Sequence, residues 1–490
     1  MSATTGAPRS AAAERDDQDD QEVLARGVRQ LRDLVGLPAD AAGATLTFTG
    51  REPVFKSRLR IASAMAMPIA VEALGVAALW RLRTGRCQDI VVDLRRAGAA
   101  VNSTYYMRQN GYQVGYGFAV VDPLTGFFQA GDGRWVRTLG SRPILRDRML
   151  DLLGCANSVP AIAKAIGRWN AQELEDVCAQ QGLVCTLIRT EAEWRAHPQG
   201  QALAGQPVIV ARTMDDSPPE PLGPGERPLA GVRVLELTHI LAGPGASRAL
   251  AAQGAEVIRI SAPLGGDPHY MVVDTGYGKK TAFLDLNTER DVARSKELIA
   301  QADVFCNSQR PGSLDARGLS MEVLRRLRPG LITLGIDCYG AGPWFGRRGF
   351  DPNAQSACGI SIEEGSFEKP GGPTSNLLAD FLCSYLGAAA VVAALYRRAT
   401  VGGGTDVRVA LTGSAMWVQG LGRFAPERIA GVAPGMPAMD HIETMPSPFG
   451  VLHYLPPIAQ YSETRGYWAM PPQPLGAWPA QWDGAARGRA

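Results

Sequence analysis

The second half of the chain alternates short apolar runs with amphipathic stretches. The apolar runs predict buried strands at residues 231–237, 255–260, 303–308 and 331–337. The amphipathic stretches predict helices at residues 245–254, 289–302 and 320–328. Strands that alternate with helices form a parallel sheet covered by helices on both faces. We therefore predict a doubly wound, Rossmann-like α/β domain in this half.

The first half has a more mixed pattern, which predicts a smaller α+β domain. Helical stretches at residues 22–36 and 171–182 are interspersed with strand-like runs at 89–94 and 183–189. A polar, Pro-rich seam separates the two halves. The predicted organisation is a disordered leader at 1–22, an N-terminal half at 23–214, a linker at 215–230, the sheet domain at 231–418 and a Pro-rich tail at 419–490.

A helix, a glycine-bearing turn and a strand occur twice in the chain. The string VAALW ends at Trp80, and VAALY ends at Tyr396, 316 positions later. Just beyond them, GRCQDIVVDL corresponds to GGGTDVRVAL. The joint correspondence predicts a duplication. At the same offset, Asp380 at the head of the second apolar helix corresponds to Ala64, so the fold does not require an acid there.

Composition excludes several classes of function. The 490 residues carry a net charge of +2 and no concentrated basic stripe, so we expect no nucleic-acid partner. The eight cysteines are scattered without a CxxC pair, which favours buried thiols in a reducing cytoplasm over disulfides or a metal site. No secretory signal is evident at the start. The apolar run 61–80 contains Pro68 and Glu72, so we expect a buried helix and no membrane span.

A glycine-containing turn after the first predicted strand raises the question of dinucleotide binding. Gly243 and Gly245 supply a GxG pair, but Arg248 stands where the third glycine of the fingerprint belongs. The next strand ends in Ser261, where a ribose-binding acid is expected. The pattern therefore disfavours NAD. A tight turn, or a helix N-terminus that faces another ligand, remains open.

Six strings in order make a specific resemblance. They are PLAGVRVLELTHILAGP, GAEVIRISAPLGGDP, GKKTAFLDLN, ADVFCNSQRPGSLDARGL, RPGLITLGIDCYGAGPWFGRRGFDPNAQSACG and NLLADF. Together they resemble the family III CoA-transferases (CaiB/BaiF), a superfamily that includes formyl-CoA transferase and alpha-methylacyl-CoA racemase. The resemblance implies a Rossmann-like domain with a smaller domain, and an interlocked homodimer. It also implies acyl-CoA and a carboxylic acid as substrates, without a permanently bound cofactor.

By this resemblance Asp380 is the catalytic residue. An aspartate in that position of relatives forms the covalent intermediate, because a carboxylate can attack a thioester to give a mixed anhydride and then an aspartyl-CoA thioester. The start of an apolar helix suits such a group, since it offers a favourable dipole and a dry environment. A helix cap is the alternative role for an aspartate at this place, and one residue can serve both.

The resemblance also assigns contacts with CoA, whose phosphates need cations. Leu241 and Ala242 would line the thioester end. The other matching positions are Lys279, Gln309, Arg310, Arg348, Gly349, Phe350 and Asp351. Relatives often differ from this chain at Leu241, Ala262, Gln309 and Ala316, which leaves the affinity for CoA open. Each basic residue could equally be a solvated surface charge.

Two further functions stay open at this level. A racemase of the same superfamily uses a histidine in a GHD string, but this chain has Phe350 there, which cannot shuttle protons. A non-catalytic acyl-CoA-binding descendant would fit the altered CoA positions, although the retained Asp380 opposes it. Neither pattern names the acyl group.

The order of segments is permuted relative to the family. Residues 63–94 resemble the region around the catalytic aspartate, and GDGRWVRTLG resembles part of the small domain, yet both precede the sheet domain. We therefore expect the N-terminal half to supply the small domain for the active site of the C-terminal half. The small domain could be donated within one chain or by a partner chain.

Overall fold

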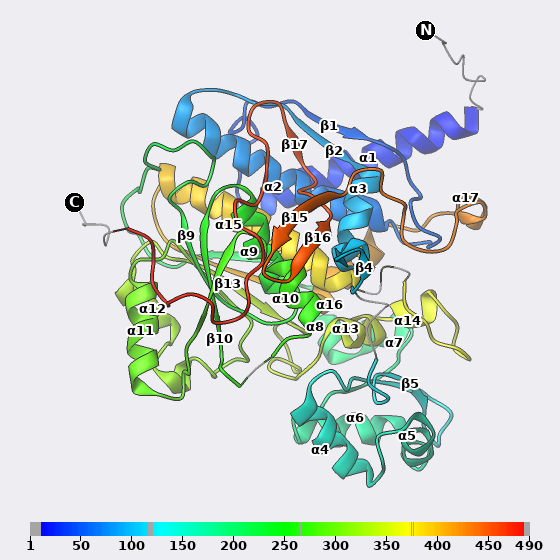
Figure 1. The fold of residues 1–490 in the computed structure, drawn as a ribbon. Coiled ribbons are helices and arrows are strands. Elements are labelled where there is room, and N and C mark those ends of the chain that lie inside the picture. Colours follow the sequence, from blue (N-terminus) through cyan, green and yellow to red (C-terminus); the bar gives the residue numbers. More distant parts are fainter. Residues whose placement is uncertain (1–10, 116–120, 265, 374, 376, 485–490) are drawn as a thin grey trace.

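The computed structural model describes residues 11–115, 121–264, 266–373, 375 and 377–484. Its centre is a seven-stranded sheet in the order β11-β10-β9-β12-β13-β14-β8 (Figure 1). The first six strands are parallel, and β8 is antiparallel to β14. The strands are β8 (Ile209–Thr213), β9 (Arg233–Leu237), β10 (Glu256–Ser261), β11 (Lys279–Phe283), β12 (Val304–Asn307), β13 (Ile332–Asp337) and β14 (Thr405–Ala410). This confirms the predicted parallel sheet.

Helices cover both faces of this sheet because successive apolar side chains of a strand point to opposite faces. On β9, Val234 belongs to the same hydrophobic cluster as α9 and α15, whereas Leu235 belongs to a second cluster with α11 and α12. The helices after each strand are α9 (Ala242–Ala252), α10 (His269–Thr275), α11 (Glu289–Ile299), the 3₁₀ turn η2 (Asp315–Arg317), α12 (Met321–Leu327), α13 (Asp351–Cys358), α14 (Ile360–Glu363), α15 (Leu378–Thr400) and α16 (Leu411–Gly420). Successive strands are added on one side of β9 up to β11 and on its other side from β12 onward, and this switch point between β9 and β12 is the usual ligand site of doubly wound sheets.

The two helices that correspond in the sequence pack against each other. These are α2 (Ile61–Thr84) and α15, and a Cβ atom on Gly75 of α2 would lie 2.7 Å from Val392 Cγ1 of α15. Both are long and apolar enough to cross a membrane, but 94% of the apolar window of each is buried. They are therefore the central helices of the core, as the sequence predicts for residues 61–80.

The predicted disordered leader is wrong for residues 11–22, because α1 (Ala11–Leu34) includes them. Asp20 on this helix is buried, and it pairs with Arg60 before α2 and with Arg428 in α17. These ion pairs hold α1 against the long helix α2. Residues 1–10 lie outside the described residues.

The predicted Pro-rich tail contributes elements to the fold. Residues 419–490 contain α17 (Pro426–Ile429), β15 (Glu443–Ser447), β16 (Gly450–Tyr454) and β17 (Gln460–Tyr461). Strand β17 pairs antiparallel with β2 (Ile90–Asp93), which itself runs parallel to β1 (Leu46–Thr49). In the same way, β8 of the first half pairs antiparallel with β14 of the second. Each half therefore completes a sheet of the other.

A third sheet joins strands of the first and second halves of the chain. It has the order β15-β16-β3-β4, with β3 (Arg108–Gln109) and β4 (Tyr112–Gln113) from the first half. The segment from β2 to β3 is formed by α3 (Leu94–Ala99) and the 3₁₀ helix η1 (Ala100–Tyr106). Both lie beside α2, and η1 also lies against α15.

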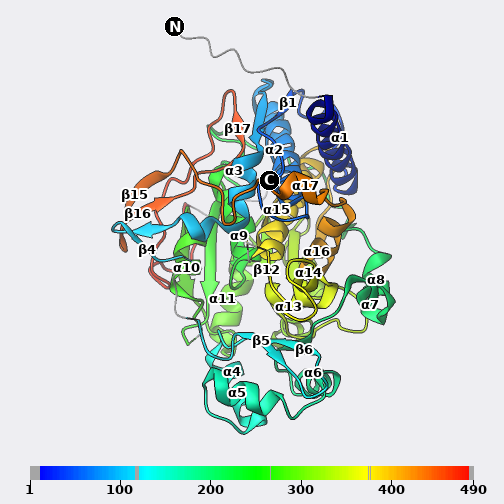
Figure 2. The ribbon, with the colours of Figure 1, turned by 90° about the vertical axis from the view of Figure 1, so that its right-hand side faces the viewer.

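The small domain predicted in the first half is a separate α+β unit below the central sheet in both views (Figures 1 and 2). Its own hydrophobic core lies between three helices and a three-stranded antiparallel sheet. The elements are β5 (Gly126–Gln129), β6 (Trp135–Thr138), α4 (Pro143–Leu153), α5 (Val159–Ile166), α6 (Ala171–Gln180) and β7 (Cys185–Leu187). Helices α7 (Glu191–Ala196) and α8 (Pro198–Ala204) then lead back to β8.

Candidate active site

A cavity of about 680 Å³ lies at the carboxyl ends of β9, β12 and β13. The loops that follow these strands form most of its wall, and the first turn of α15 contributes Asp380. The small domain closes one side with residues 142–145, at the start of α4. The cavity thus lies where a doubly wound sheet binds ligands, and it includes residues from both halves of one chain.

Two close helices hold Asp380 in place. Gly245 of α9 lies so near to α15 that a Cβ atom would be 2.3 Å from Ser384 Oγ. Ser384 donates hydrogen bonds to Ala242 O at 2.9 Å and to Asp380 O at 3.0 Å. The close crossing also brings the N–H of Ala242 to the carboxylate of Asp380. A backbone N–H beside a reacting carboxylate can stabilise negative charge as it develops.

Asp351 caps the helix on which Asp380 sits. Its Oδ2 accepts the N–H of Asp380 at 2.7 Å, and its other oxygen accepts a hydrogen bond from Gln355. Burial raises the pKa of Asp351, although these hydrogen bonds oppose the shift. Burial, and secondly the charge of Asp351, raise the pKa of Asp380 well above its usual range, while the N–H of Ala242 lowers it. The two carboxyl groups therefore influence each other's protonation.

We expect Asp351→Asn to move the acidic limb of the pH–rate profile to lower pH. The asparagine oxygen can still accept the helix N–H groups, but the negative charge that raises the pKa of Asp380 is gone. Asp380 would then lose its proton at a lower pH. The profile of kcat/KM against pH measures this, with the exposed Glu173→Gln as control. An unchanged limb, or a limb moved to higher pH, would show that Asp351 does not set the ionisation of Asp380.

Most of the predicted site residues line the cavity. Besides Asp380, these are Ala242, Gln309, Arg310, Arg348, Gly349 and Phe350. Among the residues that the structure describes, the guanidinium groups of Arg310 and Arg348 have no recorded hydrogen bond or ion pair. Partial burial, and then the positive charges of Arg310 and Arg148, lower the pKa of Arg348. Cations that repel each other and lack partners are prepared to bind an anion.

Three predicted site residues do not line the cavity. Leu241 is fully buried, and Asp351 is the buried cap of α15. Lys279 is also fully buried, where its Nζ donates to Glu236 Oε2 at 2.7 Å, Pro244 O at 2.6 Å and Ser247 Oγ at 2.8 Å. These bonds attach α9 to strands β9 and β11 of the sheet. The geometry thus gives Lys279 a positioning role, with all three of its donors in use.

The sequence did not identify the network around Asp267. This buried carboxylate lies 3.1 Å from Arg142 of the small domain and 3.7 Å from His239, and it also pairs with Arg259. Burial alone would raise the pKa of Asp267, but the contact with His239 and the charge of Arg259 lower it to about 2. Asp267 Oδ2 accepts the N–H of Ile240 at 3.0 Å.

Ile240 shows why this network matters for the site. Its φ of 65° is in the left-handed region, which β-branched residues rarely adopt. Ile240 and His239 line the cavity immediately before α9, and Arg142 faces them from the small domain. The network therefore fixes a strained loop at the cavity wall and attaches the small domain to it. No short sequence string signals it, because Arg142 and Asp267 are far apart in the chain.

The corresponding place in the first half keeps a carboxylate that caps the helix but lacks the acid within the helix. Glu52 accepts the N–H of Ser63 at 3.0 Å at the start of α2, as Asp351 does at the start of α15. Ala64, which corresponds to Asp380, is fully buried. In the described structure, α15 therefore has an acidic residue in its own first turn, Asp380, whereas the first turn of α2 has none.

Residues 229–447 match the profile of CoA-transferase family III. We call residues 229–447, which are similar to this family, the family III region. The family III region contains the six parallel strands of the central sheet, α9, and Asp380 at the start of α15. The small domain and helices α1 and α2 precede it.

Curated relatives agree with this classification. The acetyl-coenzyme A transferase nodX of Hypoxylon pulicicidum is 29% identical over 322 residues, which cover 60% of this chain and 54% of that protein. The succinyl-CoA–L-malate CoA-transferase alpha subunit of Chloroflexus aurantiacus is 31% identical over 229 residues, which cover 44% of this chain and 54% of that subunit. The chain spans about half the length of the curated relatives it matches.

Solved structures also resemble the chain. The crystal structure of Rv3272 from Mycobacterium tuberculosis is 32% identical, with a TM-score of 0.37, over 40% of this chain and 58% of that one. A CAIB/BAIF family protein from Brucella suis is 27% identical, with a TM-score of 0.36, over 46% of this chain and 65% of that one.

Proposed function

We propose that the protein transfers CoA from an acyl-CoA thioester to a carboxylic acid, with Asp380 as the nucleophile. The observation that carries this proposal is a buried carboxylate that faces a cavity with two arginines for which the described residues provide no recorded partner, within the family III region. A buried, dry carboxylate is a better nucleophile toward a thioester than a hydrated one, provided that it is ionised.

The reaction would proceed through two kinds of intermediate on Asp380. The carboxylate of Asp380 attacks the thioester carbonyl, and the carbon–sulfur bond breaks to give a mixed anhydride and CoA thiolate. The thiolate attacks the carbonyl carbon of Asp380, which releases the donor acid and leaves an aspartyl-CoA thioester. The acceptor carboxylate then attacks the aspartyl-CoA thioester, and the CoA thiolate leaves, which gives an anhydride between Asp380 and the acceptor. Attack of the thiolate on the acceptor carbonyl of this anhydride gives the new acyl-CoA and free Asp380. No step consumes water, so the thioester energy is conserved.

The residues around Asp380 suit these steps. The N–H of Ala242 can donate to the oxygen that becomes negative in each tetrahedral intermediate. Arg142 and the other small-domain residues at 142–145 exclude water on one side of the cavity. In our proposal the small domain acts within the same chain, because the first half of this chain already lines the cavity. An additional homodimer remains a prediction.

The racemase alternative finds little support in the site. Phe350 lines the cavity at the position where the racemase string has its histidine, and its ring has no exchangeable proton. His239 also lines the cavity, but Asp267 and the strained loop hold it. We therefore retain acyl transfer as the proposed reaction.

An assay of acceptor-dependent CoA transfer tests this function. Acetyl-CoA and succinyl-CoA would be the donors, since relatives carry those names, with L-malate and other short carboxylic acids as acceptors. We expect a new acyl-CoA only when both substrates are present, with parallel double-reciprocal plots, because the donor acid leaves before the acceptor reacts. Racemisation of a 2-methylacyl-CoA without an acceptor, or thioester hydrolysis alone, would contradict the proposal.

Replacing the cavity arginines Arg310 and Arg348 should weaken acyl-CoA binding. In Arg310→Gln and in Arg348→Gln we expect KM for acyl-CoA to rise about tenfold, because each loses a charge-assisted contact with a CoA phosphate. KM for the acceptor acid should change little. The exposed Arg326→Gln on α12 is the matched control. An unchanged KM in both variants would place the phosphates elsewhere.

A further inference from the structure

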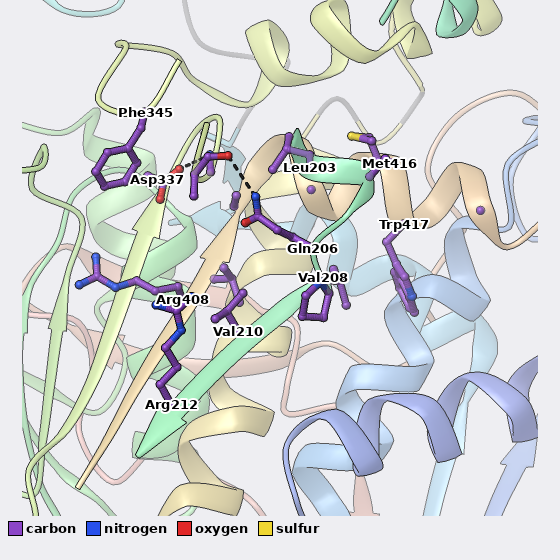
Figure 3. Close-up of a pocket in the computed structure, with 18 of the residues that line it drawn as sticks. Leu203, Gln206, Val208, Val210, Arg212, Asp337, Phe345, Arg408, Met416 and Trp417 are labelled. Carbon is purple, nitrogen blue, oxygen red and sulfur yellow. Dashed lines mark hydrogen bonds between the residues drawn. The ribbon is translucent and has the colours of Figure 1, made fainter. Parts of the chain in front are cut away.

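A second cavity, of about 520 Å³, lies on the face of β13, β14 and β8 that α15 does not cover. On β14, Val407 and Val409 point into the core beside α15, so Asp406, Arg408 and Ala410 point to the other face. The cavity walls come from the end of α8, from α16 and from the loop after β13 (Figure 3). Gln206 closes one side by donating to Ala341 O at 3.2 Å.

Basic side chains gather at one end of this cavity. The register of β8 on β14 places Arg212 opposite Asp406 and Val210 opposite Arg408, so both arginines lie on the cavity face. Arg408 is 3.2 Å from Asp406. Within the described part of the chain, the side chain of Arg212 has no recorded hydrogen bond or ion pair. This end therefore offers a free guanidinium beside a second one.

The rest of the cavity is apolar. Figure 3 shows Val208 and Val210 between the arginines and the indole of Trp417, with Met416 and Leu203 above them. Trp417 is partly exposed, and among the described residues its ring nitrogen has no recorded hydrogen-bond acceptor. A flat apolar body could lie on the valines and reach the indole.

The charges limit what can bind here. The lining has three arginines, of which Arg195 is paired with Glu191, and two aspartates, Asp337 and Asp406. Burial raises the pKa of Asp337, which the charge of Arg408 opposes. A polyphosphate would meet these carboxyl groups as well as the arginines, whereas one carboxylate can be satisfied by Arg212 and Arg408. The volume is within the usual range for a small organic ligand.

We propose that this cavity binds a small organic acid with one carboxylate and a flat apolar body, at a site separate from the thioester cavity. The carboxylate lies between Arg212 and Arg408, and the apolar body lies on Val208 and Val210 against Trp417. The two cavities are neighbours, because Asp337 contributes to the wall of both. The site does not involve Asp380, so it stands independently of the proposed transferase reaction.

Calorimetric titration of the full chain with benzoate, 3-phenylpropanoate and 4-phenylbutanoate tests this site. Saturating CoA in every titration blocks the thioester cavity. We expect at least one of these acids to bind saturably at one site, and binding to persist in Asp380→Asn. The corresponding amide, and the variants Arg212→Gln and Arg408→Gln, should bind about tenfold more weakly or worse, because a charge-assisted contact is lost.

Controls make the result decisive. Arg326→Gln removes an exposed arginine outside both cavities and should leave the affinity unchanged. Trp417→Phe should weaken binding while the fold persists by circular dichroism. Absence of saturable binding for all three acids would overturn the proposal. So would an affinity that neither arginine substitution changes.

Discussion

Asp380→Asn should reduce CoA transfer by at least about 10³-fold in kcat, because an amide cannot attack a thioester. The asparagine is isosteric, and the backbone N–H that Asp351 accepts is unaffected, so the start of α15 should remain intact. Initial rates of acyl-CoA formation measure the loss. The binding affinity for CoA, by titration, should stay within a few-fold of the original value.

Two variants control this result. Asp315→Asn changes a carboxyl group outside the cavity and should leave kcat unchanged. Ala64→Asp, added to Asp380→Asn, should not restore activity, because Ala64 is fully buried and does not line the thioester cavity. A kcat within tenfold of the original in Asp380→Asn would mean that another group performs the chemistry.

Lys279→Met should lower the free energy of unfolding by about 3 kcal/mol, because it leaves Glu236 buried without its main partner. Arg259, at 3.5 Å from Glu236, compensates only in part. Urea denaturation measures the change, and the exposed Lys164→Met is the control, for which we expect a change below about 0.5 kcal/mol.

The same variant separates two roles of Lys279. If Lys279 positions α9, stability falls, and kcat decreases together with it because Ala242 moves relative to Asp380. If Lys279 contacts CoA, as the resemblance implies, stability is retained and KM for acyl-CoA rises. Retained stability with a raised KM would contradict the structural placement.

The sequence predicts the central sheet well for a physical reason. Parallel strands that are covered on both faces are mostly apolar, and β12 and β13 have this pattern, whereas Glu236 in β9 and Arg259 in β10 interrupt it with buried charges. The paired helices α2 and α15 were likewise predictable, because each repeats the same apolar string. Asp380 could be singled out for two reasons. It is an acid among apolar residues, and the first copy of the helix has no acid at the corresponding position.

Other features have no local signal in the sequence. Lys279 belongs to a family string, but a string does not show that the side chain points into the core toward Glu236. The pairing of β17 with β2 could not be predicted from the sequence either, because β17 has only two residues and β2 lies far away in the chain. The prediction of a disordered leader was wrong for α1 because its acidic residues are typical of disordered segments. In the structure, Asp20 is instead paired with Arg60 and Arg428.

Trapping of the covalent intermediate tests the central claim most directly. The protein is incubated with acyl-CoA and hydroxylamine, digested, and analysed by peptide mass spectrometry. We predict a hydroxamate on the peptide that contains Asp380, only when acyl-CoA is present, and none in Asp380→Asn. An unmodified Asp380 under turnover, or a hydroxamate on another residue, would contradict catalysis through this aspartate.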